Sequence, residues 1–450
     1  MKLVKDFTSG NIAGQLARFT LPLYLSNLLQ IVYQIVDMII VGQVLGKIGL
    51  AAVSIGGDAA HFMAFVAMGF GNASQVLISQ LLGQKNLERL GKFIANMLSF
   101  MFVAAIFLTI FCLSIQRKFL EIMNTPAEAF QGALDYSLVS MSGIIFMYGF
   151  NMTGAILRGL GDSKHPFIFV SVSAILNLIL DLIFILQLNL GVFGAALATI
   201  ISQAVSCILC IIFLYRNREH LGFEIHSRDF FHWDRSLLGS LIGLGIPMAI
   251  KGAAIQTSKL FVNSWLNSFG VAVAAFAGIA NKIGMMANLL SNSMNTAGAS
   301  MVGQNLGAQK FDRAMKIVKI IALVTFAIAS ILSIIWWIFT REIVGFFTED
   351  LEVIAIGLEY LPIGILIFYG SAARCPMNAL INGSGDTRMN FLTALFDGII
   401  LRIGLALLFG LFFEMRYFGF WLGDAVAGFT PLWLGLIFIA SGRWKRRLEI

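Results

Sequence analysis

The sequence predicts an all-α integral membrane protein with twelve transmembrane helices in two six-helix lobes related by a pseudo-two-fold axis. Three observations predict this fold. Apolar residues far outnumber charged ones, twelve apolar runs are long enough to cross a bilayer, and a set of short motifs recurs about halfway along the chain.

The composition places the chain in lipid. Hydrophobic residues make up 58% of the 450 residues and charged residues only 12%. A soluble domain carries about twice this charged fraction, so the chain has too few charged side chains to cover a globule in water. The four cysteines lie within apolar runs, which predicts buried thiols and not a disulfide framework. They are Cys112, Cys207, Cys210 and Cys375.

The apolar runs match the thickness of a bilayer. A helix needs ~20 residues to cross a ~30 Å hydrocarbon core. Six runs fall in the first half of the chain and six in the second, which predicts twelve spans. The runs occupy residues 17–43, 49–77, 93–116, 130–157, 166–187 and 191–215, and then 237–267, 272–300, 317–340, 353–381, 389–413 and 417–440.

An internal repeat divides the chain into two lobes. Gln-Leu-Leu-Gly at 80–83 recurs as Gln-Asn-Leu-Gly at 304–307, and Gly-Leu-Gly-Asp at 159–162 recurs as Gly-Ser-Gly-Asp at 383–386. Both pairs are 224 residues apart. An even number of helices in each half gives the halves the same orientation, which favours transport by rocking of one bundle against the other. The predicted domains are a lobe at 1–215, a polar linker at 216–235 and a lobe at 236–450.

The basic residues predict the orientation. Of the 31 Lys and Arg residues, 21 fall in the termini and in loops on one side, including the tail at 443–447, and five fall in loops on the other side. Basic residues in short loops stay on the cytoplasmic side, so both termini are predicted to be cytoplasmic in a bacterial-type cell membrane. Anionic lipid headgroups explain the net charge of +7, and nucleic acid is not implied.

Four polar residues in the first half predict a site for a coupling cation. Asp37 and Asp181 each lie nine residues before a predicted outer turn and Thr199 nine residues after one, so all three lie ~13 Å below the turns. Asn177 precedes Asp181 by one helical turn and shares its face. Two carboxylates at one depth require a shared proton or a bound cation, and the oxygen ligands suit sodium equally. The alternative is that these side chains only join helices by hydrogen bonds.

Several motifs resemble the multidrug and toxic compound extrusion (MATE) family across nearly the whole chain. They are Pro22, Val36-Asp37 leading to Gly42, residues 80–92 and 157–162, Asn177 to Asp181, and Gly194 to Thr199. The resemblance implies two six-helix lobes arranged as a V and export of drugs or metabolites driven by sodium or protons. It is strongest to the archaeal and DNA-damage-inducible branches. In these branches, residues like Asp37, Asn177, Asp181 and Thr199 form an amino-lobe cation site, and helix 1 bends at a proline like Pro22. The alternative for Pro22 is a place in the first helical turn.

The second half places basic residues where the sodium-coupled branch of the family has a glutamate. Its seventh helix carries Lys251 and Gln256 in that region. One hypothesis is that these residues line the cavity and bind an anionic or zwitterionic substrate. The alternative is internal pairing, with Arg402 bound to Asp424 or Asp397, and lysines reaching out to headgroups. The candidate cavity residues are Asp58, Lys251, Gln256, Lys259, Arg374 and Arg402.

The sequence predicts a transporter and not an enzyme, because no nucleophile, base or metal cluster occurs on adjoining helices. Two similar halves favour a monomeric carrier over a symmetric channel. The expected ligands are a small-molecule substrate, membrane lipid and a coupling proton or sodium ion, with no other cofactor. The rival function is a flippase for a lipid-linked or anionic substrate of the same superfamily.

Overall fold

The computed structural model of the protein describes residues 4–123 and 125–445, and only the backbone of residues 59–62, 218 and 220. Arg446 and Arg447, from the predicted cytoplasmic tail, lie outside the described residues, as does Lys2. Every regular element within this part of the chain is helical, which confirms the predicted all-α class.

The first half of the chain folds into six α-helices and a π-helical segment, followed by short helices in the linker. The elements are α1 (Ile12–Gly83), α2 (Leu87–Ile122), α3 (Ala127–Ser142), α4 (Ile144–Gly159), α5 (Lys164–Asp181), η1 (Leu182–Gln187), α6 (Gly191–Arg216), α7 (Arg218–Leu221) and η2 (Ser227–Phe230).

The second half begins with three long helices and ends with shorter ones. The elements are α8 (Arg235–Asn267), α9 (Val271–Gly307), α10 (Phe311–Gly345), α11 (Leu351–Glu359), α12 (Leu361–Ser384), α13 (Thr387–Leu395), η3 (Phe396–Ile400), α14 (Leu401–Leu407), η4 (Leu408–Phe412), α15 (Arg416–Ala427), α16 (Thr430–Ala440) and η5 (Arg443–Lys445).

The predicted number of spans agrees with the structure. Within the described residues, ten helical stretches are long and apolar enough to cross a membrane. Two more spans are helix pairs bent at a short break: α3 with α4 at 46°, and α11 with α12 at 53°. The total is twelve when each bent pair counts as one span.

The helices extend further than the apolar runs predicted. The run predicted at 49–77 continues as helix to Gly83, and the run predicted at 272–300 continues to Gly307. Hydropathy marks only the part of a helix that lies in lipid, whereas backbone hydrogen bonding continues into the polar layers. The backbone of α1 is not helical throughout: at Gly46 the φ of +64° breaks the helix, and the chain turns there without a loop, in a conformation that suits glycine.

Contacts divide the chain into two compact units that differ from the predicted lobes. One unit contains Leu21–Ile246 and the residues before Phe7, and the other contains Phe7–Thr20 and the chain from Pro247 onward. The linker and the first turns of α8 therefore belong with the amino-terminal half, and the first turns of α1 with the carboxyl-terminal half. The predicted domain boundaries followed polarity along the sequence, whereas the units follow where each helix start packs.

The start of the chain docks on the second unit through hydrogen bonds to its backbone. Asn305 Nδ2 and Arg313 Nε donate to the Phe7 carbonyl at 3.1 and 2.9 Å, and Arg313 Nη2 donates to the Ser9 carbonyl at 2.7 Å. Phe7 is buried and packs 5.1 Å from Phe19, measured between ring centroids. These donors lie in or beside the repeated motif at 304–307, so this copy of the repeat holds the segment that leads into α1.

The linker docks on the first unit in a similar way. Asn96 Nδ2 donates to the carbonyls of Asp229 and His232 at 2.7 and 3.2 Å, and Asn96 Oδ1 accepts from the Asp234 N–H at 2.6 Å. Lys92 Nζ lies 3.2 Å from Asp234 Oδ2. Partial burial raises the pKa of Asp234, but the hydrogen bond from Lys92 outweighs it and leaves that pKa below its ordinary value.

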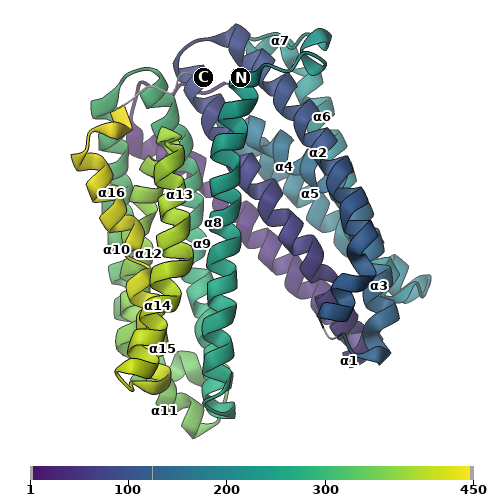
Figure 1. The fold of residues 1–450 in the computed structure, drawn as a ribbon, viewed down its shortest axis with the longest axis vertical. Coiled ribbons are helices and arrows are strands. Elements are labelled where there is room, and N and C mark those ends of the chain that lie inside the picture. Colours follow the sequence, from purple (N-terminus) through teal and green to yellow (C-terminus); the bar gives the residue numbers. More distant parts are fainter. Residues whose placement is uncertain (1–3, 124, 446–450) are drawn as a thin grey trace. The chain divides into compact units, whose positions relative to one another are not determined.

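One helix forms the centre of each unit. In the first unit, α6 packs against α3, α4 and α5. In the second unit, α12 packs against α9, α10, α15 and α16, and Figure 1 shows α12 among the green and yellow helices of this part of the chain. α6 carries Thr199 and α12 carries Arg374, so each central helix contributes a polar side chain to a candidate site.

We predict that glycine is required where α14 meets α15. A Cβ added at Gly423 would overlap the backbone N and Cα of Ala406, which cannot move aside as a flexible side chain would. Gly423→Ala should therefore lower the unfolding free energy by ~1–3 kcal/mol. The matched control is Gly404→Ala, because nothing lies within 4 Å of an added Cβ there, and helix propensity should add ~0.5–1 kcal/mol. Thermal unfolding in detergent measures both, and equal midpoints would contradict this packing.

Candidate functional site

The carboxyl groups of Asp37 and Asp181 meet inside the first unit. Asp37 lies on α1, and Asp181 is the last residue of α5. Asp181 is fully buried, with 0% of its surface exposed, and Asp37 is half-buried. The two carboxyls are close enough to share a hydrogen bond when one of them carries a proton. The two acids predicted to lie at one depth are therefore direct neighbours.

This carboxyl pair lacks the partners that a buried acid needs. Both oxygens of Asp181 and Oδ1 of Asp37 are buried without a hydrogen-bond partner, and no ion pair reaches either group among the described residues. Two adjacent carboxylates in a low-dielectric interior repel each other and lose their hydration. The arrangement is stable only when a proton or another cation is present, so it can bind and release positive charge.

Asn177 and Thr199 bond to each other between α5 and α6. Asn177 is buried one turn before Asp181 on the same helix face, and its Nδ2 donates to Thr199 Oγ1 at 3.4 Å. Thr199 Oγ1 in turn donates to the Ala195 carbonyl at 3.2 Å. The four residues proposed for the coupling site thus lie in the same unit, but neither Asn177 nor Thr199 bonds Asp181, whose oxygens have no hydrogen-bond partner.

Two tyrosines that the sequence reasoning did not select complete this group. Tyr136 on α3 interacts electrostatically with both Asp37 and Asp181, and its hydroxyl bonds the Ser140 side chain. Tyr33 lies one turn before Asp37 on α1 and interacts with it. Both had a signal in the sequence: Tyr33 has the i, i+4 spacing to Asp37, and Tyr136 belongs to a Leu-acid-Tyr block that recurs at Tyr360.

A π-helical segment follows directly after Asp181. Leu182–Gln187 forms η1, and a second π-helical segment, Leu408–Phe412, occupies the corresponding place in the other half. A third, Phe396–Ile400, contains Asp397. A π-helix has a wider turn, with i→i+5 hydrogen bonds in place of the usual i→i+4 bonds, and such segments are frequent at functional sites. Two of the three segments adjoin or contain a buried acid.

Pro22 lies in the interior of α1 and not in its first turn, which corrects one of the two expectations for this residue. α1 begins at Ile12, because the docked segment after Phe7 lets the helix start well before the apolar run. Pro22 has no N–H for the i−4 carbonyl and therefore breaks the helical ladder at that point. Pro22 and Pro247 of α8 are both interior, and the division between the two units falls within two residues of each.

The second unit holds a buried ionic network. Arg402 Nη2 lies 3.0 Å from Asp397 Oδ1, and Arg402 Nη1 also pairs with Asp424. Arg374 Nη2 pairs with the other oxygen of Asp397. Asp397 is 0% exposed and Arg402 is buried. Internal pairing is thus present for Arg402, which binds both of the acids named as alternatives.

The remaining candidate residues occupy different environments. Lys251 Nζ donates to Asn378 Oδ1 at 2.7 Å, and Lys259 is half-buried two helical turns further along α8. Gln256 and Asp58 are exposed on α8 and α1. The structure therefore brings Lys251 and Lys259 toward the ionic network but places Gln256 and Asp58 at the surface of their units.

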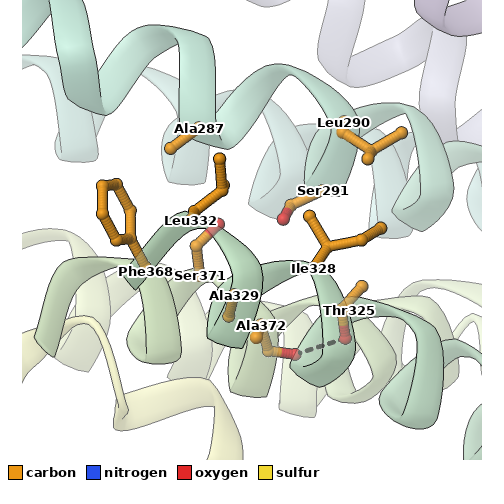
Figure 2. Close-up of a pocket in the computed structure, with 10 residues that line it drawn as sticks. All are labelled: Ala287, Leu290, Ser291, Thr325, Ile328, Ala329, Leu332, Phe368, Ser371 and Ala372. Atoms are coloured by element: carbon orange, nitrogen blue, oxygen red, sulfur yellow. Dashed lines mark hydrogen bonds between the residues drawn. The ribbon is translucent and has the colours of Figure 1, made fainter. Parts of the chain in front are cut away.

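A small cavity in the second unit is too small for a drug-sized molecule. It measures about 10 Å³, about the room of one water molecule, and lies between α9, α10 and α12 (Figure 2). Thr325 Oγ1 donates to the Ala372 carbonyl at 3.0 Å beside it, as Figure 2 shows. Pro376 has no N–H to donate to this carbonyl within α12. The Thr325 hydroxyl supplies the missing hydrogen bond to the Ala372 carbonyl. This cavity belongs to helix packing.

Comparison with known proteins identifies relatives along the whole chain. The MatE family model matches residues 22–183 and 247–408, so the two matched segments begin 225 residues apart and confirm the predicted repeat. The Bacillus subtilis protein "Probable multidrug resistance protein YoeA" is 28% identical over 415 residues, covering 91% of this chain and 89% of that protein.

Two solved structures share the fold. A MOP superfamily transporter from Pyrococcus furiosus, described as having a binding pocket of reverse polarity, superposes with a TM-score of 0.89 at 22% identity and 98% coverage of both chains. A MATE transporter in a bent conformation superposes with a TM-score of 0.87 at 22% identity, covering 98% of this chain and 97% of that one. The likeness extends over both halves.

We predict that the carboxyl pair lowers the stability of the fold. Asp181→Asn should raise the thermal midpoint in detergent at neutral pH, equivalent to ~1–3 kcal/mol, because an amide can donate to Asp37 where a carboxylate repels it. Asp135→Asn serves as the control. Its Oδ1 already accepts from Gln131 at 2.9 Å, so its midpoint should stay unchanged. A lower midpoint for Asp181→Asn would show that the ionised pair is stabilising.

Proposed function

Because the chain belongs to the MatE family of multidrug efflux transporters, we propose that it is a cation-coupled antiporter that exports drugs or metabolites by alternating access. It is a multi-pass membrane transporter and not an enzyme, and its substrates are small molecules. The single observation that carries the coupled mechanism is the pair of adjacent carboxyls, Asp37 and Asp181, in which both oxygens of Asp181 and Oδ1 of Asp37 are buried without a hydrogen-bond partner.

The carboxyl pair supplies the coupling chemistry. A cation that reaches Asp37 and Asp181 cancels their repulsion and stabilises the packing of α1 against α5. Loss of the cation restores the repulsion and favours a different arrangement of α1. Binding free energy at this site thus selects between two states of the carrier, which is the thermodynamic requirement for coupling.

Two coupling ions fit this proposal. Direct contact between the carboxyls favours a shared proton, since a sodium ion would have to lie between them. The carboxylate, amide and hydroxyl oxygens of Asp37, Asp181, Asn177 and Thr199 are also hard ligands of the type that sodium takes. Transport driven separately by a proton gradient and by a sodium gradient tells the two ions apart.

The same proposal includes the placement of the protein in the membrane. The excess of basic residues at the termini and linker supports cytoplasmic termini in a bacterial-type cell membrane. The internal repeat supports a monomeric carrier in which the two halves move as units. The rival function is a flippase that moves a lipid-linked anion, and the basic residues of the second unit are the observation that favours it.

Pro22 is the proposed hinge of this cycle. It interrupts the hydrogen-bond ladder of α1 in the helix interior, two residues after the point where the chain passes from one unit to the other. Asp37 lies fifteen residues further along the same helix. A bend at Pro22 therefore moves the part of α1 that carries the coupling carboxyl.

We predict that Asp37→Asn abolishes gradient-driven export in proteoliposomes, because a neutral amide cannot take up and release the coupling cation. Efflux of a dye should fall to the level of protein-free liposomes under either gradient. The control is Glu121→Gln, an exposed acid paired only with Arg117 at 3.4 Å, which should transport as the unmodified protein does. Export by Asp37→Asn at the normal rate would refute the assignment.

We also predict that Pro22→Ala raises the stability of the protein but reduces export. Restoring an N–H in the interior of α1 should stabilise the helix by up to ~3 kcal/mol and reduce export if bending is required. Pro362→Ala is the matched control, since Pro362 is exposed at the start of α12, where a missing N–H breaks no helical bond. Full export by Pro22→Ala, together with a raised thermal midpoint, would exclude the hinge role.

A further inference from the structure

We propose that the basic side chains in and beside the ionic network of the second unit, Lys251, Lys259, Arg374 and Arg402, form a binding site for an oxyanion such as a carboxylate or phosphate group. This inference names a ligand chemistry for the transporter. It rests on the proposed function only for the statement that a bound solute is carried across the membrane. The binding itself follows from the charge balance of the site.

The site contains more cations than anions. Four basic side chains surround two acidic ones, Asp397 and Asp424, so two positive charges remain when both lysines are protonated. An uncompensated charge inside a membrane protein is costly unless a partner reaches it. Among the described residues, every ion pair of the site joins an arginine to one of these two acids. The lysines interact with the acids only at longer range.

The two acids form their ion pairs with the arginines. Arg402 holds one oxygen of Asp397 and one of Asp424, and Arg374 holds the other oxygen of Asp397. Lys259 makes no hydrogen bond or ion pair with any described residue, but it interacts electrostatically with Asp397 and Asp424. The Nε of Arg374 is buried and also lacks a partner. The site therefore retains unused donors beside an excess of positive charge.

The helices hold these donors close together. Ser258 of α8 donates to the Gly398 carbonyl of η3, and this contact sets α8 directly against the segment that carries Asp397. Lys251 and Lys259 are eight residues apart on α8, so they share one face at a spacing of ~12 Å. Arg374 interacts electrostatically with both lysines.

The site is partly exposed on one side of the unit. The Arg374 side chain is 19% exposed and that of Asp424 is 22% exposed, whereas Asp397 is closed off. Asn378, which accepts from Lys251, adds an amide that can orient a polar ligand. The Arg402–Asp397 ion pair is buried, whereas Lys251 and Lys259 are half-buried. Half-buried cations beside a buried ion pair are suited to binding an anion that comes from outside the unit.

The test measures dye binding to the full chain in nanodiscs without any ion gradient. Fluorescence anisotropy should show binding of carboxyfluorescein, an anionic xanthene, with a dissociation constant about tenfold weaker in Lys259→Gln and Lys251→Gln. Lys259→Arg keeps the charge and should bind as the unmodified protein does. Lys319→Gln, an exposed cation on α10 of the same unit, is the matched control and should change nothing. A rhodamine methyl ester, a cationic xanthene, should not respond to these substitutions.

The lipid composition of the nanodiscs identifies the source of the oxyanion. If a headgroup occupies the site, phosphatidylglycerol should weaken carboxyfluorescein binding to the unmodified protein but not to Lys259→Gln. If the ligand is a soluble solute, neutral and anionic nanodiscs should give the same affinity. Equal affinities of the unmodified protein, Lys259→Gln and Lys251→Gln in both lipids, with all three folded by size-exclusion chromatography, would overturn the proposal.

Failure here is distinguishable from failure of the coupled mechanism. Asp37→Asn should bind carboxyfluorescein normally, because Asp37 belongs to the other unit. Loss of anion binding only in the lysine variants supports the oxyanion site even if export proves independent of Asp37. Gradient-driven export of the cationic dye with no measurable anion binding rejects the oxyanion site and leaves the coupled mechanism intact.

Discussion

Charge inside a membrane protein must be neutralised by a partner, and this constraint governs both halves of the molecule. The first unit places Asp37 against Asp181 with no donor or cation to balance them. The fold can keep these acids together only when something from outside the chain supplies positive charge. An arrangement that would be a defect in a soluble protein is therefore the feature on which the proposed cation coupling depends.

The second unit meets the same constraint differently. Asp397 and Asp424 neutralise Arg402 and part of Arg374, and the network stays buried at the centre of the helices. The lysines of α8 exceed what the acids can balance. In the two proposals made above, one half of the molecule takes positive charge from outside and the other takes negative charge. A carrier with this division can bind a coupling cation and an anionic group on separate helices.

The chain joins these two halves through helices that start on one unit and continue in the other. Backbone carbonyls near Phe7 are held by Asn305 and Arg313, while those of the linker are held by Asn96. The docking anchors the first turns of α1 and α8, and each helix then passes a proline in its interior. Each proline removes one backbone hydrogen bond, so the ladder of each helix is interrupted close to the boundary between the units.

The sequence by itself determined the all-helical fold, the number of spans and the repeat, because hydropathy and motif spacing are local properties that survive without knowledge of packing. It also selected Asp37, Asn177, Asp181 and Thr199, since distance along a helix from an outer turn converts directly into depth. Only the tertiary structure decided that Tyr136 lies near the two acids, that Arg402 binds two acids at once, and that the first turns of α1 and α8 are grouped with the opposite unit. Those facts depend on which helix faces which, and neighbouring faces are set by side chains hundreds of residues apart.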